Sequence, residues 1–480
     1  MRKQPKDKKF ISLPRYLISL VAVAIIAVGG TSMYFEYKIQ MEEAENGSSE
    51  GDLKKVDTLY NDIIQNYVGK VDKGKLVDGA LKGMTEALDD PFTNYFSQED
   101  ASELNESLSG SFEGIGATMM IKEDLPTIAE TPEKGTPAAK AGLEKGDVFL
   151  KINGKSTEGK TLDTVVKEIR GEKGTIVKIT YKRGEDIHSV SVVRASITNK
   201  SITYSMDSEQ KSIGKIQISN FSETSFKELK TAVQELRKQE AKKFIIDLRG
   251  NPGGYLDQVE KMSSMFLKDG KTIVEFEDKQ GKITKEKASK TLDGGFKVTD
   301  PTVVLVDGNS ASASEIFAAA LNQSAGDDIV GTKTFGKGTV QTVNHFGDES
   351  EVKLTIMKWL TPNGSWIHEK GLEPTIKIDY PEYAYLKGIT ASEDLKVGGK
   401  SGEIKNLNRI LKAVDFDVDD TDEFNEKTEN AVKTIQEQDK LHVTGKVDEQ
   451  TSFAIEKRLY DKIMKNDTAY KKAVEVLTKE

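Results

Sequence analysis

The alternation of strand-like and helix-like segments between residues 201 and 385 restricts the fold of this chain more than any other feature. The strand-like runs are short and rich in β-branched residues: 213–218, 244–248, 302–306 and 328–331. Between them, apolar residues recur at helical spacing in 226–239, 256–266 and 314–322. This order predicts an α/β domain with helices beside the sheet and functional loops at the strand ends. Because 480 residues exceed what one core can bury, we expect several domains.

An uncharged apolar run precedes these domains, at residues 16–35. Its 20 residues are about the length that a helix needs to cross a bilayer. Lysine and arginine crowd residues 1–15, whereas glutamate dominates the residues that follow, and this bias predicts that the bulk of the chain lies outside the cytoplasm. We predict a membrane anchor. A signal peptide cleaved near Ala27-Val28-Gly29 is the alternative, and the protein would then be secreted.

The composition excludes several kinds of function. The chain has no cysteine, which rules out thiol catalysis and cysteine-based metal sites. Its four histidines, His188, His345, His368 and His442, lack the spacing of a zinc site, so we expect neither a metal nor a cofactor. The formal net charge of −9 argues against nucleic acid as a partner.

Two short segments of the α/β region carry residues that suit a catalytic site. Residues 310–315 read Ser-Ala-Ser-Ala-Ser-Glu at the predicted start of a helix, and Lys337 lies between Gly336 and Gly338. A serine hydroxyl needs a neighbouring base, and a lysine can be that base only when it is neutral. Since no histidine lies beside either segment, we predict Ser312 as the nucleophile and Lys337 as the base.

Nearby residues suit the supporting roles of such a site. The N–H of Ala313, at the helix start, is a candidate donor to the oxyanion that forms during acyl transfer. Gly253 and Gly254, at the end of another strand, are the other candidate donors because glycine lets the backbone approach a substrate. Gln341 follows Lys337 by four residues and is a candidate to hold the lysine amine.

Two other interpretations stay open at the level of residue chemistry. The three serines of 310–315 could form only a polar helix cap, with Lys337 an ordinary surface lysine. A Ser–His–Asp arrangement would need His345 as its base, but no Gly-x-Ser-x-Gly turn accompanies it.

The two segments, extended to 310–320 and 334–341, closely resemble the carboxy-terminal processing proteases, which are Ser–Lys endopeptidases with a PDZ domain. The separation of 25 residues between Ser312 and Lys337 also matches that family. The similarity runs from about residue 56 to 381, and it is greatest to the CtpB-type enzymes of spore-forming Gram-positive bacteria.

This resemblance implies both the fold and the site. The core would be an α/β protease core of the crotonase or tail-specific-protease type. On the family pattern, Ser312 is the nucleophile, Lys337 is the general base and Gln341 orients the lysine. Residues 248–254, with Gly253 and Gly254, correspond to the oxyanion loop of the family.

Residues 111–195 are predicted to form a small β-rich module. Gly114-Ile115-Gly116-Ala117 can point N–H groups at a terminal carboxylate, and the strand edge that follows can pair with a peptide; a plain turn is the alternative. The segment 136–154 resembles a bacterial PDZ domain, which implies recognition of apolar C-terminal tails. Arg170 lies where that family often has an arginine facing the protease core. We hypothesise that Arg170 gates the catalytic site, the alternative being a solvated charge.

The regions on either side are predicted to be helical. Apolar spacing indicates helices in 53–110, which would be packing struts or arms of a homodimer. Residues 398–480 resemble the three-helix peptidoglycan-binding-like domain, but Asn408 stands where that family usually has glutamine. Contact with peptidoglycan and a structural or dimer role both remain open.

We therefore predict a multidomain α/β and α+β protein that is a PDZ-gated, extracytoplasmic serine endopeptidase. It would process protein substrates recognised by their apolar C-termini, in regulatory proteolysis such as a step in sporulation. A catalytically silent PDZ and peptidoglycan-binding scaffold is the alternative, and a Ser–Lys amidase for small amides is another. The predicted regions are a basic cytoplasmic tail (1–15), the membrane segment (16–35), the helical region (53–110), the PDZ domain (111–195), the protease core (201–385) and the helical C-terminal domain (398–480).

Overall fold

The computed structural model describes residues 49–391 and 395–479. The predicted membrane segment, 16–35, lies outside these ranges. In the part of the chain that is described, no helix is long and apolar enough to cross a bilayer. The chain divides into two units between Asp90 and Pro91.

The first unit contributes two described helices, both within the region predicted to be helical. They are α2 (Ser49–Asn66) and α3 (Lys73–Glu86). α3 begins at Asp72, whose carboxylate accepts hydrogen bonds from the N–H groups of Gly74 and Lys75. Such a cap satisfies backbone donors that have no partner inside the helix.

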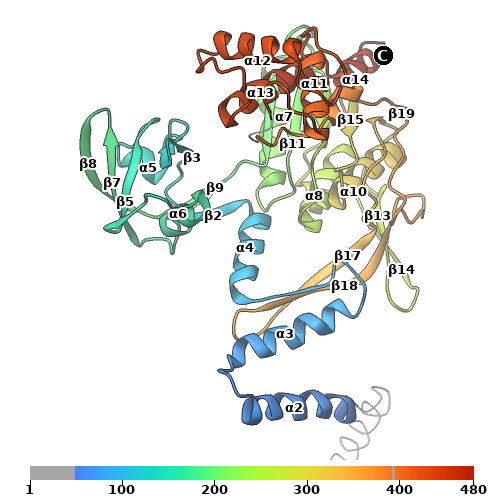
Figure 1. Cartoon of the computed structure of the whole chain (residues 1–480). Coiled ribbons are helices and arrows are strands. Elements are labelled where there is room, and N and C mark those ends of the chain that lie inside the picture. The colour runs from blue at the N-terminus through green and yellow to red at the C-terminus, as the bar shows by residue number, and fades with distance from the viewer. Residues whose placement is uncertain (1–48, 392–394, 480) are drawn as a thin grey trace, which may run out of the picture. The chain divides into compact units, whose positions relative to one another are not determined.

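The α/β part of the second unit is built on a six-stranded sheet (Figure 1). The strand order is β10 (Ile202–Met206), β11 (Ile213–Ile218), β12 (Lys243–Asp247), β15 (Thr302–Val306), β16 (Asp328–Gly331) and β19 (Ile376–Lys377). β10 is antiparallel to β11, and all other neighbours pair in parallel. The strands predicted at 213–218, 302–306 and 328–331 are confirmed with the same bounds, and the one at 244–248 is shifted by one residue.

Helices cover both faces of this sheet. Three of them pack on one face: α7 (Ser225–Lys238), α8 (Leu256–Phe266) and α10 (Ala313–Ala320). The last helix, α14 (Thr468–Lys479), packs on the other face. Because successive residues of a strand point to opposite faces, Ile246 and Val304 are in the first core while Ile245 and Val303 contact α14. The final helix of the predicted C-terminal region is thus part of the α/β core.

A second, antiparallel sheet contains the strand that follows the lysine segment. Its strands are β1 (Asn94–Phe96), β18 (Glu351–Leu360), β13 (Thr272–Glu277) and β14 (Ile283–Lys287), and β17 (Thr339–His345) also pairs with β18. β1 falls inside the region predicted to be helical, 53–110, because three residues are too short to show a period. α4 (Gln98–Ser109) follows β1, with the Ser97 hydroxyl as its cap.

The predicted PDZ module has its own six-stranded sheet and core. The sheet order is β3 (Met119–Lys122), β4 (Leu125–Ile128), β5 (Val148–Ile152), β7 (Ile176–Arg183) and β8 (Asp186–Val193), with β6 (Lys155–Ser156) beside β5. Two helices, α5 (Pro137–Lys140) and α6 (Leu162–Ile169), complete the module, and β2 (Ser111–Gly114) pairs with β9 (Ala195–Thr198) where the chain enters and leaves it.

Three helices before α14 enclose a further core: α11 (Gly402–Ala413), α12 (Glu426–Gln438) and α13 (Glu449–Lys465). Asn408 is fully buried there, donates to the carbonyls of Thr421 and Glu423, and accepts from the Thr428 hydroxyl. These bonds hold the loop between α11 and α12, so Asn408 has a structural role within this domain.

Candidate active site

Three loops that follow neighbouring parallel strands meet at one edge of the six-stranded sheet. β12, β15 and β16 lie side by side and end at Asp247, Val306 and Gly331. The loop after β12 carries the predicted oxyanion glycines, the loop after β15 leads to Ser312, and the loop after β16 carries Lys337. Because the carboxyl ends of parallel strands share one edge, the sheet brings together segments that are distant in the sequence.

Ser312 is half-buried at the start of α10 and has a left-handed φ of 56°. This conformation is uncommon for a residue with a side chain and must be held by its surroundings. The flanking serines do so: the buried Ser310 hydroxyl donates to the Leu248 carbonyl (2.8 Å), and the buried Ser314 hydroxyl donates to the Asn251 carbonyl (2.9 Å). Both acceptors belong to the loop after β12, so the two outer serines attach the turn that carries Ser312 to that loop.

Glu315 joins the serine turn to the lysine loop, a role that the sequence analysis missed. Its carboxylate is fully buried, and Oε2 accepts from the N–H groups of Ser312 (2.8 Å) and Lys337 (2.9 Å). Oε1 accepts from the Thr334 hydroxyl (2.6 Å) and the Gly336 N–H (2.7 Å). Burial raises the pKa of Glu315, while the four hydrogen bonds oppose it by favouring the carboxylate. A glutamate three residues after the helix-capping serine was the available signal.

The lysine loop is held by both tryptophans of the chain. The Trp359 indole N–H donates to the Lys337 carbonyl (2.7 Å), and the Trp366 indole N–H donates to the Gly338 carbonyl (2.8 Å). The Lys337 amine lies over the Phe92 ring, 4.9 Å from its centre. The sequence did not indicate these aromatic residues because they meet the loop only in the folded chain.

Gln341, on β17, lines the same cavity as Lys337. Its amide nitrogen donates to the hydroxyls of Thr339 (2.9 Å) and Thr355 (3.2 Å). These two bonds use the donors of the amide and leave its oxygen to accept from an amine. That Gln341 orients Lys337 stays a prediction. Its amide oxygen is the atom that would accept a hydrogen bond from the Lys337 amine.

The three predicted oxyanion donors differ in their surroundings. The Gly253 N–H donates to the Asn251 side-chain oxygen (2.9 Å) and is therefore engaged within its own loop. Gly254 pairs with Phe221 in an isolated parallel bridge. The two hydrogen bonds of this bridge are donated by the Phe221 N–H to the Gly253 carbonyl and by the Tyr255 N–H to the Phe221 carbonyl. Ala313 is the first residue of α10, so its N–H precedes the intrahelical hydrogen bonds. Within the described structure, the N–H groups of Gly254 and Ala313 have no acceptor and suit the predicted role better than that of Gly253.

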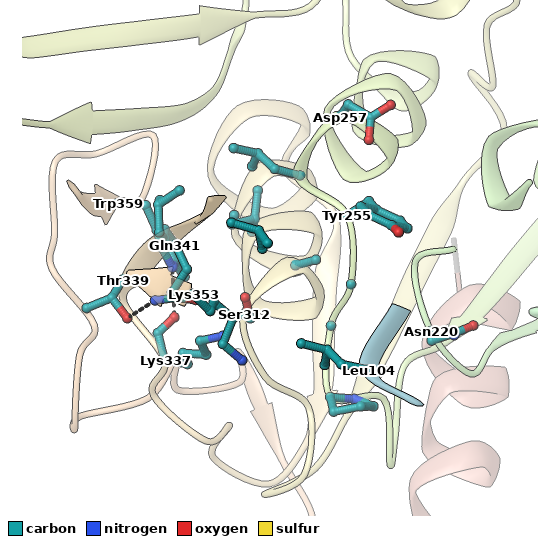
Figure 2. A pocket seen from close by; sticks show the side chains of 18 residues that line it. Leu104, Asn220, Tyr255, Asp257, Ser312, Lys337, Thr339, Gln341, Lys353 and Trp359 are labelled. Atoms are coloured by element: carbon teal, nitrogen blue, oxygen red, sulfur yellow. Dashed lines mark hydrogen bonds between the residues drawn. The ribbon is translucent and has the colours of Figure 1, made fainter. Parts of the chain in front are cut away.

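A cavity of about 500 Å³ contains the candidate residues (Figure 2). Ser312, Lys337 and Gln341 lie near one another along its wall. Part of the remaining lining is apolar: Leu104, Leu256, Ile316, Val340, Val343 and Trp359. The charged residues Asp257 and Lys353 and the polar residues Asn220 and Thr339 also line the cavity, which therefore offers a peptide both apolar and polar contacts.

The predicted peptide-binding loop lies between β2 and β3 of the PDZ module. Ile115 is buried in the core of the module, and its carbonyl accepts from the Ala138 N–H (2.8 Å). Among the described residues, the N–H groups of Ile115, Gly116 and Ala117 donate to no acceptor. β3 is at the edge of its sheet, so its outer side can pair with an added strand.

Arg170 follows α6 and contacts α4. It does not line the cavity that Ser312 and Lys337 line. Its guanidinium pairs with Glu106 and lies 4.8 Å from the centre of the Phe112 ring. Arg170 lines a second cavity together with Asn220, and Asn220 also lines the catalytic cavity. The gating role of Arg170 stays a prediction. Arg170 could affect the catalytic cavity through α4, which it contacts, or through the loop of Asn220, which lines both cavities.

His345 is the base that the Ser–His–Asp interpretation required. Its Nδ1 lies 2.8 Å from a carboxylate oxygen of Glu351, and the side chain is outside the catalytic cavity. The structure therefore does not support that interpretation. No group of three or more His, Asp and Glu side chains in the described ranges could hold a metal ion.

Four family profiles match the chain. They are "Peptidase family S41" over residues 212–378, "PDZ domain" over 128–183, "Activating protease CtpB N-terminal domain" over 26–100 and "Putative peptidoglycan binding domain" over 400–455. The S41 match includes the serine turn and the lysine loop.

Curated relatives match over nearly the whole chain. The "Carboxy-terminal processing protease CtpA" of Bacillus subtilis is 42% identical over 91% of this chain and 93% of its own length. A "Probable CtpA-like serine protease" of Staphylococcus aureus is 38% identical over 98% of this chain and 93% of its own length. Among solved structures, the photosystem II D1 C-terminal processing protease is 27% identical, with a TM-score of 0.41 over 70% of this chain and 88% of its own.

Proposed function

This chain belongs to peptidase family S41 as a serine-type C-terminal processing peptidase with a PDZ domain, and from that premise we propose that Ser312 and Lys337 perform the cleavage. The observation that supports this most is that Ser312 and Lys337 line one cavity. Behind it, the buried Glu315 carboxylate accepts from the backbone N–H groups of both residues. A nucleophile and a base must lie within reach of each other, and this connection determines the separation of their backbones.

The proposed reaction proceeds through an acyl-enzyme. Neutral Lys337 takes the proton of Ser312, and Oγ attacks the peptide carbonyl, whose oxygen becomes an oxyanion stabilised by the N–H groups of Ala313 and Gly254. The C–N bond then breaks as the lysine ammonium gives its proton to the leaving amine. Water, deprotonated by the same lysine, attacks the acyl carbon, and the returned proton restores Ser312. Gln341 would hold the amine through its amide oxygen.

The PDZ module would select the substrate and gate the site. The unpaired N–H groups of residues 115–117 suit a terminal carboxylate, and the edge of β3 suits an extended C-terminal tail. Two residues of this loop and strand, Ala117 and Met119, are apolar and partly buried against the core of the module. An apolar tail is therefore the proposed ligand, and Arg170 the proposed link to α4.

The cellular setting is proposed from the sequence. The basic residues before the apolar run at 16–35 support an enzyme anchored in the membrane, with its domains and substrates on the extracytoplasmic side. The profile match at 400–455 supports contact with peptidoglycan, and a homodimer is proposed on the helical region 53–110. Regulatory cleavage in sporulation rests on the resemblance to the CtpB-type enzymes.

The test uses the chain from residue 51 onward, incubated with an unfolded protein. Ser312→Ala and Lys337→Ala are measured beside the unchanged chain, each with and without a peptide that ends in apolar residues. Loss of cleavage in both variants, with peptide stimulation of the unchanged chain, is the expected result. Cleavage retained by Ser312→Ala would overturn the proposed nucleophile. If no sample cleaves, a serine-directed fluorophosphonate that labels the unchanged chain and not Ser312→Ala still identifies the nucleophile, and absence of labelling favours the scaffold alternative.

A further inference from the structure

The loop that carries the predicted oxyanion glycines is attached to the sheet by a buried arginine. Arg249 is the second residue after β12, and its side chain is only 9% exposed. Its guanidinium donates to both carboxylate oxygens of Asp247, at 2.8 and 2.7 Å. The same guanidinium donates to both oxygens of Asp467, at 2.8 and 2.7 Å, and also to the Tyr380 hydroxyl.

Asp467 comes from the far end of the chain, more than 200 residues away. It lies between the end of α13 and the first residue of α14, and its Oδ1 also accepts from the Tyr470 N–H (2.9 Å) in the first turn of α14. The residues on either side are tied down as well. The Asn466 amide donates to the Tyr383 hydroxyl (3.1 Å), and the Thr468 hydroxyl donates to the Asp379 carbonyl (2.9 Å).

The charges of this cluster balance. Two carboxylates, Asp247 and Asp467, face Arg249 and Lys215, whose amine lies 3.9 Å from Asp247. Burial by itself disfavours the charge on Arg249, but its hydrogen bonds to the two carboxylates outweigh this effect and its pKa is raised. A guanidinium held by two bidentate carboxylates has no rotational freedom, so its backbone is positioned as well.

The anchored segment is hydrogen-bonded to the segment that carries Ser312. One residue after Arg249, the Gly250 N–H donates to Asp307 (3.0 Å) in the loop that leads to Ser312. The Leu248 carbonyl on the other side of Arg249 accepts from the Ser310 hydroxyl. Displacing Arg249 would therefore move both the oxyanion loop and the backbone that supports Ser312.

We propose that Asp467 is a positioning residue for catalysis: by clamping Arg249 from the start of the C-terminal helix, it holds the oxyanion loop against the Ser312 turn. This inference rests on the function proposed above. It means that one residue directly before the last helix supports the site, whereas the helix itself serves to pack on the sheet.

The test compares Asp467→Asn with Leu477→Ala in the full chain. Leu477 is fully buried on α14, the helix that Asp467 precedes. It packs against the sheet and does not contact Arg249. Both variants lower stability, so each is assayed well below its unfolding temperature. The measured quantities are kcat and KM for a peptide substrate and the rate at which a fluorophosphonate labels Ser312, since that reagent also needs the oxyanion site.

Asp467→Asn is expected to lower kcat and the labelling rate about tenfold or more, with KM little changed, because a small displacement of the reacting groups has large effects on rate. Leu477→Ala is expected to keep both rates within about threefold of the unchanged chain. Equal effects of the two variants, or unchanged rates in Asp467→Asn, would overturn the inference.

If Asp467→Asn does not fold, Tyr380→Phe decides: it removes one acceptor of Arg249 without changing charge, and a kcat equal to that of the unchanged chain would contradict the proposal. Loss of the proposed function itself would show separately, as activity that survives Ser312→Ala.

Discussion

The backbone N–H groups of Ser312 and Lys337 donate to one and the same oxygen, Oε2 of Glu315, at 2.8 and 2.9 Å. The segments of the proposed nucleophile and the proposed base are thus joined by a single buried carboxylate, and both residues line one cavity. Because an ionised carboxylate is only an acceptor, its second oxygen can hold two more donors, the Thr334 hydroxyl and the Gly336 N–H, where an amide would place its own N–H groups.

Glu315→Gln is expected to lower both stability and activity. The amide nitrogen must face two donors, whichever oxygen it replaces, which is expected to cost about 2–5 kcal/mol and to reduce kcat about 100-fold. Peptide turnover and thermal unfolding measure the two effects. Glu228→Gln is the matched control, since Glu228 also accepts several hydrogen bonds, among them the N–H groups of Ser201 and Ile202, away from the cavity. A similar loss of kcat in the control would refute a specific role of Glu315.

Gly253→Ala is expected to abolish most activity. The residue has a φ of 112°, and a Cβ there would lie 2.9 Å from the Ala311 carbonyl oxygen and from the Ser312 Cβ, so the nucleophile must move. We expect kcat to fall by about 100-fold or more. Gly250→Ala shares the strain of a positive φ (72°) but its Cβ would meet nothing within 4 Å, so it should keep kcat within about tenfold. Steady-state kinetics of both variants decide the point, and comparable activity in the two would show that the close approach is unimportant.

Arg170→Ala is expected to remove the stimulation of turnover by an apolar-tailed peptide. The reason is its ion pair with Glu106 on α4, the helix that also supplies Leu104 to the catalytic cavity. Turnover is measured over a range of peptide concentrations, with peptide binding followed separately. Lys182→Ala serves as the control because Lys182 is a partly exposed cation of the same module whose ion pair, with Glu185, does not involve α4. Stimulation that persists unchanged in Arg170→Ala would end the gating hypothesis.

Glu260, on α8, should make stability depend on pH. Burial, together with the charges of Glu286 and Asp257, raises the pKa of Glu260 to about 7. The fold therefore favours the neutral acid: this contribution to stability is complete below about pH 4, the unfolded pKa, and is lost as the pH rises through 7. Between pH 5 and 8, the unchanged chain is expected to lose about 1 kcal/mol of its free energy of unfolding through this group, allowing for partial exposure. Glu260→Gln is expected not to show this loss. Chemical denaturation at both pH values measures it.

The control for this pH effect is Glu185→Gln, because the side chain of Glu185 is 94% exposed. Its unfolding free energy should follow that of the unchanged chain at both pH values. If Glu260→Gln keeps the same pH dependence as the unchanged chain, the carboxyl of Glu260 is not the group responsible.

The sequence by itself determined the α/β core, the PDZ module and the identity of the candidate catalytic residues. It could do so because these features are local: β-branched runs for β11, β15 and β16, helical spacing for α8, and an uninterrupted serine motif at 310–315. Short elements escaped it, as β1 did, since three residues show no period and the strand exists only by pairing with β18.

Only the tertiary structure decided which distant groups support the site. The Glu315 carboxylate, the indoles of Trp359 and Trp366, and the clamp of Asp467 on Arg249 all join segments that no pattern in the sequence connects. Tertiary packing also assigned α14 to the face of the sheet, although sequence spacing had grouped it with the C-terminal domain. Periodicity shows which face of a helix is apolar, but the surface that this face covers depends on where the folded chain brings its complement.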